Sequence, residues 1–336
     1  MELTGIVFDS IKDKGLFISN FKWLMSIRTN TIISLAFICC FSCECIGQGN
    51  SDKVAIETEG AHYKIKIQNT VLEIDPSIGG RITALTLDGQ NFLTDSTVND
   101  FNFGSSFWLS PQSDWNWPPS AEIDNKPYTA TIKDNELIMV SPADPKTGIV
   151  VTKKIAGNKK KGSFVLKYTI TNHSDKPQMV APWEVTRVHI NGFAFFPMGT
   201  GDIRGGLIPL LKKENGIVWF DYDSARLPVK GDRQIYTDGA EGWLSEVNNG
   251  IVLTKKFPDI PIEKQAPKEG EIELYASPVK PGKSYVEIEH QGEYKQLQPG
   301  ESTTWEVVWF LRKLPGNIKP EVGNPLLVSY VRKLIK

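Results

Sequence analysis

The sequence predicts an all-β protein, an antiparallel sandwich or barrel of many short strands. From Ser51 onward, short runs that alternate apolar and polar residues follow one another, as half-buried strands do. Turn sequences such as Asp88-Gly89 and Asn249-Gly250 separate some of these runs, and such pairs are typical of tight hairpins. The 21 prolines and 28 glycines are spread through the turns, and no low-complexity linker divides the chain. Removing a 47-residue leader from 336 residues leaves 289, which suits one large two-sheet sandwich.

The strands are expected in a regular series. They cover residues 62–68, 70–75, 81–87, 91–93, 136–140, 148–155, 163–171, 178–189, 217–222, 242–247, 251–257, 271–276, 284–290 and 303–312. The lysines at 159–161 stand between Gly157 and Gly162, and we expect them to cap a hairpin loop. Residues 258–270 are expected to form a second surface excursion.

The chain is divided as follows. We predict a leader over 1–47, a linker over 48–60, the sandwich over 61–314 and a C-terminal tail over 315–336. Only residues 326–334 have apolar residues at helical spacing, so a short helix is expected in the tail.

The N-terminus carries the features of an export signal. Arg28 precedes residues 31–41, an apolar run of signal-peptide length. This run is shorter than the roughly 20 apolar residues that a membrane-spanning helix needs. Residues 1–24 are mixed in character, so we expect translation to start at Met25 and the signal peptide to cover 25–47.

Two routes of processing are compatible with the leader. It contains all four cysteines of the chain, Cys39, Cys40, Cys43 and Cys45. No disulfide or cysteine metal site is therefore expected in the folded part. Cleavage after Gly47 would release a periplasmic or secreted protein that begins at Gln48. Alternatively, Cys43 would become the lipid-modified first residue of a lipoprotein, although Cys40 stands where such signals usually have leucine. Soluble release is favoured, and both routes export the protein.

The composition excludes several classes of function. With 38 Lys and Arg against 39 Asp and Glu, the formal net charge is −1, which gives no electrostatic reason to expect a nucleic-acid partner. The four histidines show no paired spacing, so no metal site is expected. No Gly-rich loop opens a helix and no Gly-x-Ser-x-Gly sequence occurs, so neither a nucleotide cofactor nor an esterase is indicated. Carboxylates and aromatic residues remain as candidate functional groups.

A proline-bounded segment, residues 107–119, is rich in tryptophan. It contains Trp108, Gln112, Asp114, Trp115 and Trp117. In an extended chain, Trp115 and Trp117 would project to the same side, because side chains alternate along a strand. Flat indole rings with polar groups between them suit a sugar, whose C–H groups pack on rings while its hydroxyls bind polar side chains. The alternative is a buried loop whose tryptophans close one end of the core.

Residues 181–189 form an expected strand with two chemically different faces. Trp183, Arg187 and His189 share one face, and Glu184 lies on the other. These groups are candidates for a binding or catalytic site. The alternative is an edge strand with a solvated ion pair.

Residues 286–291 show a second alternation. Glu287 and Glu289 share one face of the expected strand, while Ile288 and His290 share the other. Alternating glutamates are also the ordinary pattern of a solvent-exposed face, so the alternation by itself does not define a site.

The order of several short motifs resembles the galactose mutarotase-like (aldose 1-epimerase) superfamily. The motifs are Gly79-Gly80-Arg81-Ile-Thr-Ala-Leu, Glu289-His290-Gln291 and Leu297-x-Pro299-Gly300-Glu301. The resemblance covers most of residues 61–314, and the Trp-x-Trp-Pro-Pro and Ala-Pro-Trp-Glu sequences are similar to an uncharacterised, secreted branch of that superfamily. It implies a large antiparallel β-supersandwich with a sugar cleft on one sheet.

The resemblance also implies a mechanism. In mutarotases, a carboxylate removes the proton of the anomeric hydroxyl while a histidine protonates the ring oxygen, which opens the ring. Glu289 matches the family's base position. Where the family has its acid histidine, this chain has Trp183-Glu184. The acid would then be Glu184, with a pKa raised by burial or a neighbouring charge, or His189.

The favoured function is an exported protein that binds a carbohydrate in a mutarotase-like cleft, and action on the anomeric centre of that sugar is a second, separate hypothesis. The expected wall and polar contacts are Trp108, Trp115, Trp117, Trp183, Arg81, Gln112, Asp114, Glu184, Arg187 and Glu289. One alternative is a glycoside hydrolase or lyase that uses Glu184 and Glu289. Another is a non-catalytic structural or interaction domain whose tryptophans belong to the core.

Overall fold

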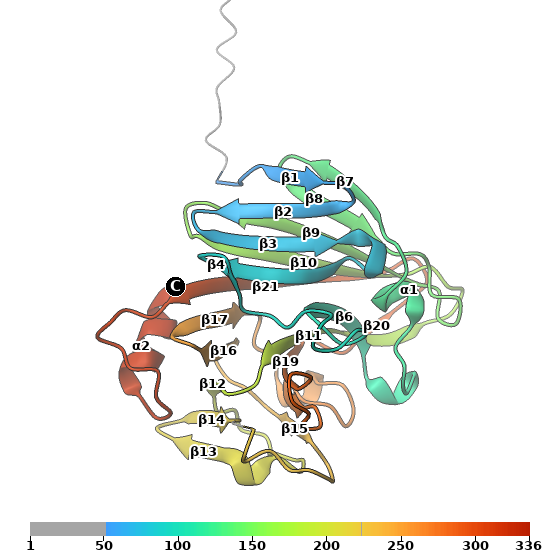
Figure 1. Cartoon of the computed structure of the whole chain (residues 1–336). Coiled ribbons are helices and arrows are strands. Elements are labelled where there is room, and N and C mark those ends of the chain that lie inside the picture. The colour runs from blue at the N-terminus through green and yellow to red at the C-terminus, as the bar shows by residue number, and fades with distance from the viewer. Residues whose placement is uncertain (1–51, 223) are drawn as a thin grey trace, which may run out of the picture. The chain divides into compact units, whose positions relative to one another are not determined.

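The computed structural model describes residues 52–222 and 224–336, which form two large antiparallel β-sheets (Figure 1). The predicted leader over 1–47, with Cys43, lies outside the described residues. The predicted fold class, a large antiparallel β-sandwich, is confirmed by the two sheets. No helix in the described part of the chain is long and apolar enough to cross a membrane.

The first sheet has eleven strands. In spatial order it runs β1 (Ile56–Glu59), β2 (His62–Ile67), β3 (Thr70–Asp75), β4 (Arg81–Leu87), β6 (Ser105–Ser110), β11 (Gln178–His189), β19 (Tyr285–Gln291), β18 (Ile272–Ala276) and β15 (Gln234–Thr237). Two short strands complete it, β5 (Gln90–Asn91) beside β4 and β20 (Lys295–Leu297) beside β11. The long strand β11 thus pairs with strands that lie more than 70 residues before it and more than 90 residues after it in the sequence.

The second sheet has ten strands. Its order is β13 (Leu211–Glu214), β14 (Ile217–Asp221), β12 (Phe193–Pro197), β16 (Trp243–Asn248), β17 (Ile251–Lys256), β21 (Ser302–Lys313), β10 (Ser163–Asn172), β9 (Ile149–Asn158), β8 (Glu136–Val140) and β7 (Thr129–Lys133). The lysines at 159–161 lie in the turn of the β9–β10 hairpin, where Asn158 pairs with Ser163.

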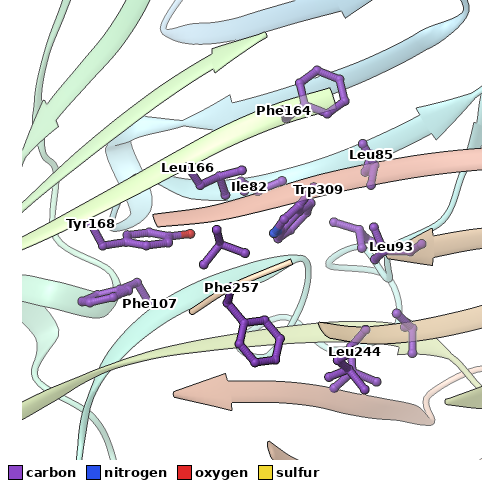
Figure 2. Close-up of a cluster of buried hydrophobic side chains, with 14 of the residues drawn as sticks. Ile82, Leu85, Leu93, Phe107, Phe164, Leu166, Tyr168, Leu244, Phe257 and Trp309 are labelled. Carbon is purple, nitrogen blue, oxygen red and sulfur yellow. The ribbon is translucent and has the colours of Figure 1, made fainter. Parts of the chain in front are cut away.

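The main core lies between the two sheets, because each sheet turns its apolar side chains toward the other. On β10, Phe164, Leu166 and Tyr168 are buried, and Figure 2 shows them close to Ile82 of β4 and Trp309 of β21. Removing such apolar surface from water is the main favourable contribution to folding. The same alternation sends the intervening side chains of each strand to the opposite face of its sheet.

Strand β12 shows where the sequence pattern fails. It was not among the expected strands, because Phe-Ala-Phe-Phe-Pro does not alternate. Phe196 lies in the core between the sheets, whereas Phe195 packs on the outer face of the ten-stranded sheet beneath a helix. A strand that is buried on both faces has a continuous apolar sequence, which periodicity cannot assign.

The C-terminal helix α2 (Pro325–Leu334) covers that outer face. The side chain of Asn324 caps the helix by accepting a hydrogen bond from the backbone N–H of Leu326, and Pro325 occupies the first turn. Leu327 and Val331 are buried in a second apolar cluster that includes Phe195 and residues of several strands of the sheet. The helix lies over the range that the sequence pattern predicts. The other α-helix, α1 (Ala121–Asp124), is a single turn.

Candidate functional site

A cleft opens on the outer face of the eleven-stranded sheet, away from the core. Its volume is about 310 Å³, and the residues that line it are Asn102, Trp108, Gln112, Trp117, Trp183, Gln234, Tyr236, Tyr275, Tyr285, Glu287 and Glu289. We call it the Trp117 cleft. Most of these residues belong to β6, β11, β19, β18 and β15, which are neighbours in the sheet. The cleft therefore rests on a continuous, hydrogen-bonded floor.

Strand β19 contributes two carboxylates to this floor. Its alternate residues Val286 and Ile288 lie in the core between the sheets. Glu287 and Glu289 therefore point to the opposite face, where both line the cleft. They are 7% and 1% exposed, so the two carboxyl groups are held in a poorly solvated place.

Glu289 has a second buried carboxylate beside it. Glu273 lies opposite Glu289 on the neighbouring strand β18. Gln234 Nε2 donates to Glu273 Oε2 at 3.0 Å and to Glu289 Oε1 at 3.4 Å. Burial raises the pKa of Glu289 well above its usual value, and the charge of Glu287 raises it further. Burial and the charge of Glu289 raise the pKa of Glu273 as well.

The hydrogen bonds decide which of these two carboxyls keeps a proton. Glu273 accepts hydrogen bonds from Gln291 Nε2 at 2.7 Å and from the backbone N–H of Gly270 at 3.0 Å, in addition to the bond from Gln234. N–H donors favour a carboxylate over a carboxylic acid. Glu289 accepts a hydrogen bond only from Gln234 in the described part of the chain, through a long contact. These donors favour a proton on Glu289, while the nearby carboxyl of Glu269 raises the pKa of Glu273 and acts in the opposite direction.

Glu287 is in a different environment, because it has a cation. Arg187 Nε donates to Glu287 Oε1 at 2.7 Å, and the guanidinium also bonds Ser106 Oγ and lies 4.9 Å from the ring centroid of Trp108. Burial raises the pKa of Glu287, while the charge and the hydrogen bond of Arg187 oppose this shift. The ion pair with Arg187 favours the ionised form of Glu287, whereas Glu289 has no such partner.

Three tryptophans form the aromatic wall of the cleft. Trp108 and Trp183 are cross-strand partners on β6 and β11, with ring centroids 5.4 Å apart and rings nearly perpendicular. Both are almost fully buried, whereas Trp117 is 53% exposed and packs edge-on against Trp108 at 5.8 Å. The exposed indole of Trp117 is the part of the wall that a ligand can cover.

The segment that carries Trp115 and Trp117 is not extended, so the expectation that both indoles project to the same side is wrong. A 3₁₀ turn spans Gln112–Asp114, and Asn116 has a positive φ of 58°. Trp117 lines the cleft, but Trp115 lines a different pocket and donates its indole N–H to the carbonyl of Leu109 at 2.7 Å. The turn breaks the period of two on which the expectation depended.

Two buried polar atoms on β11 and β19, two of the strands beneath the cleft, have no hydrogen-bond partner in the described chain. They are Nε1 of Trp183, which donates, and Oε1 of Gln291, which accepts. The two residues lie directly opposite each other on β11 and β19. Unpartnered buried polar atoms are costly, and a hydroxyl group, which both donates and accepts, would satisfy them.

Besides Trp115, three more of the predicted site residues, Arg81, Asp114 and His189, lie outside the cleft. Arg81 is buried behind the cleft, where it donates to the carbonyl of Phe101 at 2.5 Å and pairs with Asp124 at 3.3 Å. Burial lowers the pKa of Arg81 to about 10. Asp114 lines the same pocket as Trp115. His189 is exposed at the end of β11 and is not among the residues that line the cleft.

Glu184 lies on the other face of β11, inside the sandwich. It is fully buried and accepts hydrogen bonds from Lys255 at 2.8 Å, from the hydroxyl of Tyr168 at 2.6 Å and from the indole of Trp309 at 3.0 Å. Figure 2 shows the Tyr168 hydroxyl and the Trp309 indole nitrogen turned toward the same space. Desolvation lowers the pKa of Lys255, and the charge of Glu184 opposes this. This cluster is a buried polar core, and His290 Nε2 lies 3.5 Å from Glu184 Oε1 within it.

The position of Glu184 argues against the expected catalytic pair of Glu184 and Glu289. Glu184 points into the sandwich and Glu289 points into the cleft, so the sheet itself separates the two carboxylates. A hydrolase needs both carboxylates on one glycosidic bond. The same separation removes Glu184 as the acid that would replace the family's histidine, because it does not reach the cleft.

Several residues of the cleft were not predicted. They are Asn102, Gln234, Tyr236, Tyr275 and Tyr285, together with Glu273 beneath Glu289. One signal was available, because Tyr285, Glu287 and Glu289 follow one another at a period of two. Gln234 and Tyr236 come from β15, a short strand at the edge of the sheet that the sequence pattern did not identify.

The described residues offer no protein-built metal site. No group of three or more His, Cys, Asp or Glu side chains within residues 52–222 and 224–336 is arranged to hold a metal ion.

Comparison with solved structures identifies the fold. A putative aldose 1-epimerase from Klebsiella pneumoniae subsp. pneumoniae superposes with a TM-score of 0.56 at 14% identity, covering 83% of this chain and 85% of that one. A putative aldose 1-epimerase from Escherichia coli K12 gives 0.51 at 11% identity, covering 75% and 99%. A TPR-domain containing protein from Parabacteroides distasonis gives 0.54 at 15% identity, covering 76% of this chain but only 47% of that longer one. The fold is that of the galactose mutarotase-like sandwiches.

The family follows from a match to the sequence itself. Residues 62–312, most of the chain, match the model of the family described as "Domain of unknown function (DUF4380)". The chain belongs to that family. A comparison with curated proteins gives no match. The fold and the family together confirm the expected mutarotase-like architecture and leave the activity to be inferred from the cleft.

Proposed function

We propose that this protein binds a carbohydrate in the Trp117 cleft and acts on its anomeric centre. The observation that carries the proposal is a pair of buried carboxyl groups on the floor of an aromatic-walled cleft, Glu287, which pairs with Arg187, and Glu289, which has no cation beside it. The mutarotase-like fold supports it, because several proteins with this fold are described as putative aldose 1-epimerases.

The lining suits a sugar ring. The exposed indole of Trp117 offers a flat surface for the C–H groups of a sugar. The unpartnered atoms of Trp183 and Gln291 suit one hydroxyl group. Burial raises the pKa of the Tyr236 and Tyr285 hydroxyls, so these remain neutral and can both donate and accept hydrogen bonds.

Ring opening needs one group that takes the proton of the anomeric hydroxyl and another that delivers a proton to the ring oxygen. Two carboxyl groups can share the roles of base and acid when their environments give them different pKa values. Glu287, which its ion pair with Arg187 favours in the ionised form, would accept the proton of the anomeric hydroxyl. Glu289, which would be protonated before the sugar binds, would donate its proton to the ring oxygen. In the reverse direction, ring closure, the two residues exchange roles, so each carboxyl ends in its starting state.

This assignment changes the role that the resemblance implies for Glu289. The resemblance makes Glu289 the base, whereas burial and the charge of Glu287 raise the pKa of Glu289, which favours a role as the acid. No histidine is needed, because Glu289 supplies the proton. His189 and Glu184 have no part in this proposal.

The proposal is tested by binding and by exchange. The protein is screened by calorimetry and on a glycan array, and NMR exchange spectroscopy then measures the interconversion of the two anomers of each sugar that binds. Saturable binding together with faster anomer exchange is the expected result. Binding without acceleration would leave a carbohydrate-binding protein, and the absence of both would refute the proposal.

We also propose that the protein is exported, because an apolar run follows Arg28 and is followed by residues compatible with cleavage. Intact-mass measurement of the native protein distinguishes a terminus at Gln48 from a lipidated Cys43. A cytosolic product that retains Met25 would contradict export by either route.

A further inference from the structure

A second cavity, also of about 310 Å³, lies beside the aromatic wall of the cleft. Its lining consists of Trp108, Leu109, Ser110, Pro111, Asp114, Trp115, Pro119, Ser120, Ile123, Asp144, Lys146, Thr147, Ile149, Gln178, Met179 and Val180. We call it the Trp115 pocket. These residues come from both sheets and from the 111–124 segment, so the pocket is enclosed by parts of the chain that are far apart in sequence. A volume of this size accepts a small organic group.

Most of the lining is apolar, and the polar groups are largely engaged with one another. Asp144 Oδ1 accepts hydrogen bonds from the backbone N–H groups of Lys146 and Thr147, and Lys146 Nζ donates to the carbonyl of Asp114 at 3.0 Å. Gln178 Nε2 donates to Ser174 Oγ. A sugar ring needs several free hydrogen-bonding groups, and this pocket does not offer them.

One polar atom of the pocket has no partner in the described chain. Ser110 is 2% exposed, and its Oγ atom is buried without a hydrogen bond. The residue lies two positions after Trp108 on β6, so both side chains project from the same face of the strand. An apolar group that carries one oxygen atom would satisfy this hydroxyl and fill the apolar volume around it.

The pocket adjoins the Trp117 cleft through one indole. Trp108 lines both cavities. Trp115 and Trp117 both pack edge-on against it, at 5.9 and 5.8 Å, and each lines a different one of the two cavities. Groups bound in the two cavities would therefore touch the same side chain.

We propose that the Trp115 pocket binds the apolar, non-sugar group of a glycoside whose sugar ring lies in the Trp117 cleft. The binding of the sugar ring rests on the proposed function, and the binding of the non-sugar group rests on the lining of the Trp115 pocket. The group is a neutral ring. The lining includes the carboxylates of Asp114 and Asp144 and the ammonium of Lys146. An anionic substituent would therefore be attracted by one charge and repelled by two.

The pocket is tested first by itself, with benzyl alcohol as the probe and benzoate as its anionic counterpart. Benzyl alcohol is expected to bind the whole protein with a Kd on the order of 1–10 mM, as suits a fragment of this size, and benzoate more weakly. Met179→Trp fills the pocket from its exposed rim and should abolish binding. Met198→Trp is the matched control, because Met198 is equally exposed, at 43%, and lines neither cavity.

Two further variants locate the probe. Ser110→Ala removes the unpartnered hydroxyl and should weaken benzyl alcohol about 2- to 10-fold. Trp117→Ala, in the cleft, should leave it unchanged. No binding of benzyl alcohol, loss of binding in Met198→Trp as well as in Met179→Trp, or loss only in Trp117→Ala would each overturn the inference.

The two cavities are then tested together with methyl and benzyl glycosides of the sugars that bind. The benzyl glycoside should bind at least about 10-fold tighter than the methyl glycoside, and Met179→Trp should remove this difference while leaving the methyl glycoside unaffected. Equal affinities of the two glycosides would overturn the inference even if the sugar binds. If no methyl glycoside binds while benzyl alcohol still fills the pocket, the proposed function of the cleft fails instead.

Discussion

Glu273 and Glu289 lie opposite each other on β18 and β19, and the side-chain amide of Gln234 donates a hydrogen bond to both. Two buried carboxyls in this arrangement do not both ionise readily, because like charges repel, and the charge of Glu289 raises the pKa of Glu273. Glu273, which does not itself line the cleft, is thus a positioning residue that controls the protonation of Glu289.

Replacing Glu273 is therefore predicted to move the pH profile. Glu273→Gln removes a neighbouring negative charge, so the pKa of Glu289 falls. If Glu289 is the acid, activity is lost as pH rises through its pKa, and this alkaline limb should move to lower pH. The rate of anomer exchange against pH, in wild type and variant, is the measurement. A shift of the acidic limb instead would make Glu289 the base, and an unchanged profile would remove Glu273 from the mechanism.

The two carboxyls of the cleft should separate catalysis from binding. Glu289→Gln and Glu287→Gln keep the shape of each side chain, so sugar binding should survive while the rate of anomer exchange falls about 100-fold or more in each variant. Glu306→Gln, on the exposed face of the other sheet, is the matched control and should behave as wild type. Wild-type exchange in either cleft variant would exclude that residue from proton transfer.

Replacing a tryptophan of the wall should affect sugar binding if its indole is exposed and fold stability if its indole is buried. Trp117 is 53% exposed, so Trp117→Ala should weaken sugar binding with little change in stability. Trp183 is 2% exposed, and Trp183→Ala should cost about 3–5 kcal/mol of unfolding free energy. Thermal melts beside binding titrations test both. Binding unchanged in Trp117→Ala would show that this indole does not contact the ligand.

The polar cluster inside the sandwich should govern stability. Lys255→Met leaves Glu184 as a buried charge without its cation, which should cost about 3–5 kcal/mol. Adding Glu184→Gln removes the unpaired charge, so the double variant should recover part of that loss. Urea unfolding of the two variants gives both values. A double variant less stable than Lys255→Met would show that Glu184 stabilises the fold through its bonds to Tyr168 and Trp309 instead.

Glu246 should make the fold sensitive to alkaline pH. It is fully buried on β16, its Oε1 accepts a hydrogen bond from the Tyr222 hydroxyl at 2.6 Å, and burial raises its pKa well above the usual value. Because the pKa in the folded state exceeds that in the unfolded state, the unfolded state releases its proton first. Stability therefore falls as pH rises from the unfolded pKa through the folded one.

Glu246→Gln should reduce this pH dependence, since the amide cannot ionise. The melting temperature of the variant relative to wild type should be higher at pH 8 than at pH 5, with Glu306→Gln as the control. A difference between variant and wild type that is the same at both pH values would show that Glu246 does not titrate in this range.

Alternation along single strands accounts for what could be predicted of the site. The sequence places Glu287 and Glu289 on one face of β19 and Ile288 on the other, and it places Glu184 opposite Trp183 on β11; the structure has both arrangements. The failure at Trp115 has a local cause, because the 3₁₀ turn and the positive φ of Asn116 interrupt the alternation.

By itself, the sequence determined the all-β class and the face that each side chain of a regular strand takes, because both depend on a period of two that is local to the chain. Only the tertiary structure decided which face became the cleft and which the core. It also decided that Glu273 lies beside Glu289 and that Arg187 lies beside Glu287. Arg187 and Glu287 come from strands that are distant in sequence, whereas Glu273 and Glu289 come from the consecutive strands β18 and β19. Their register is fixed by the packing of the two sheets, which no local pattern records.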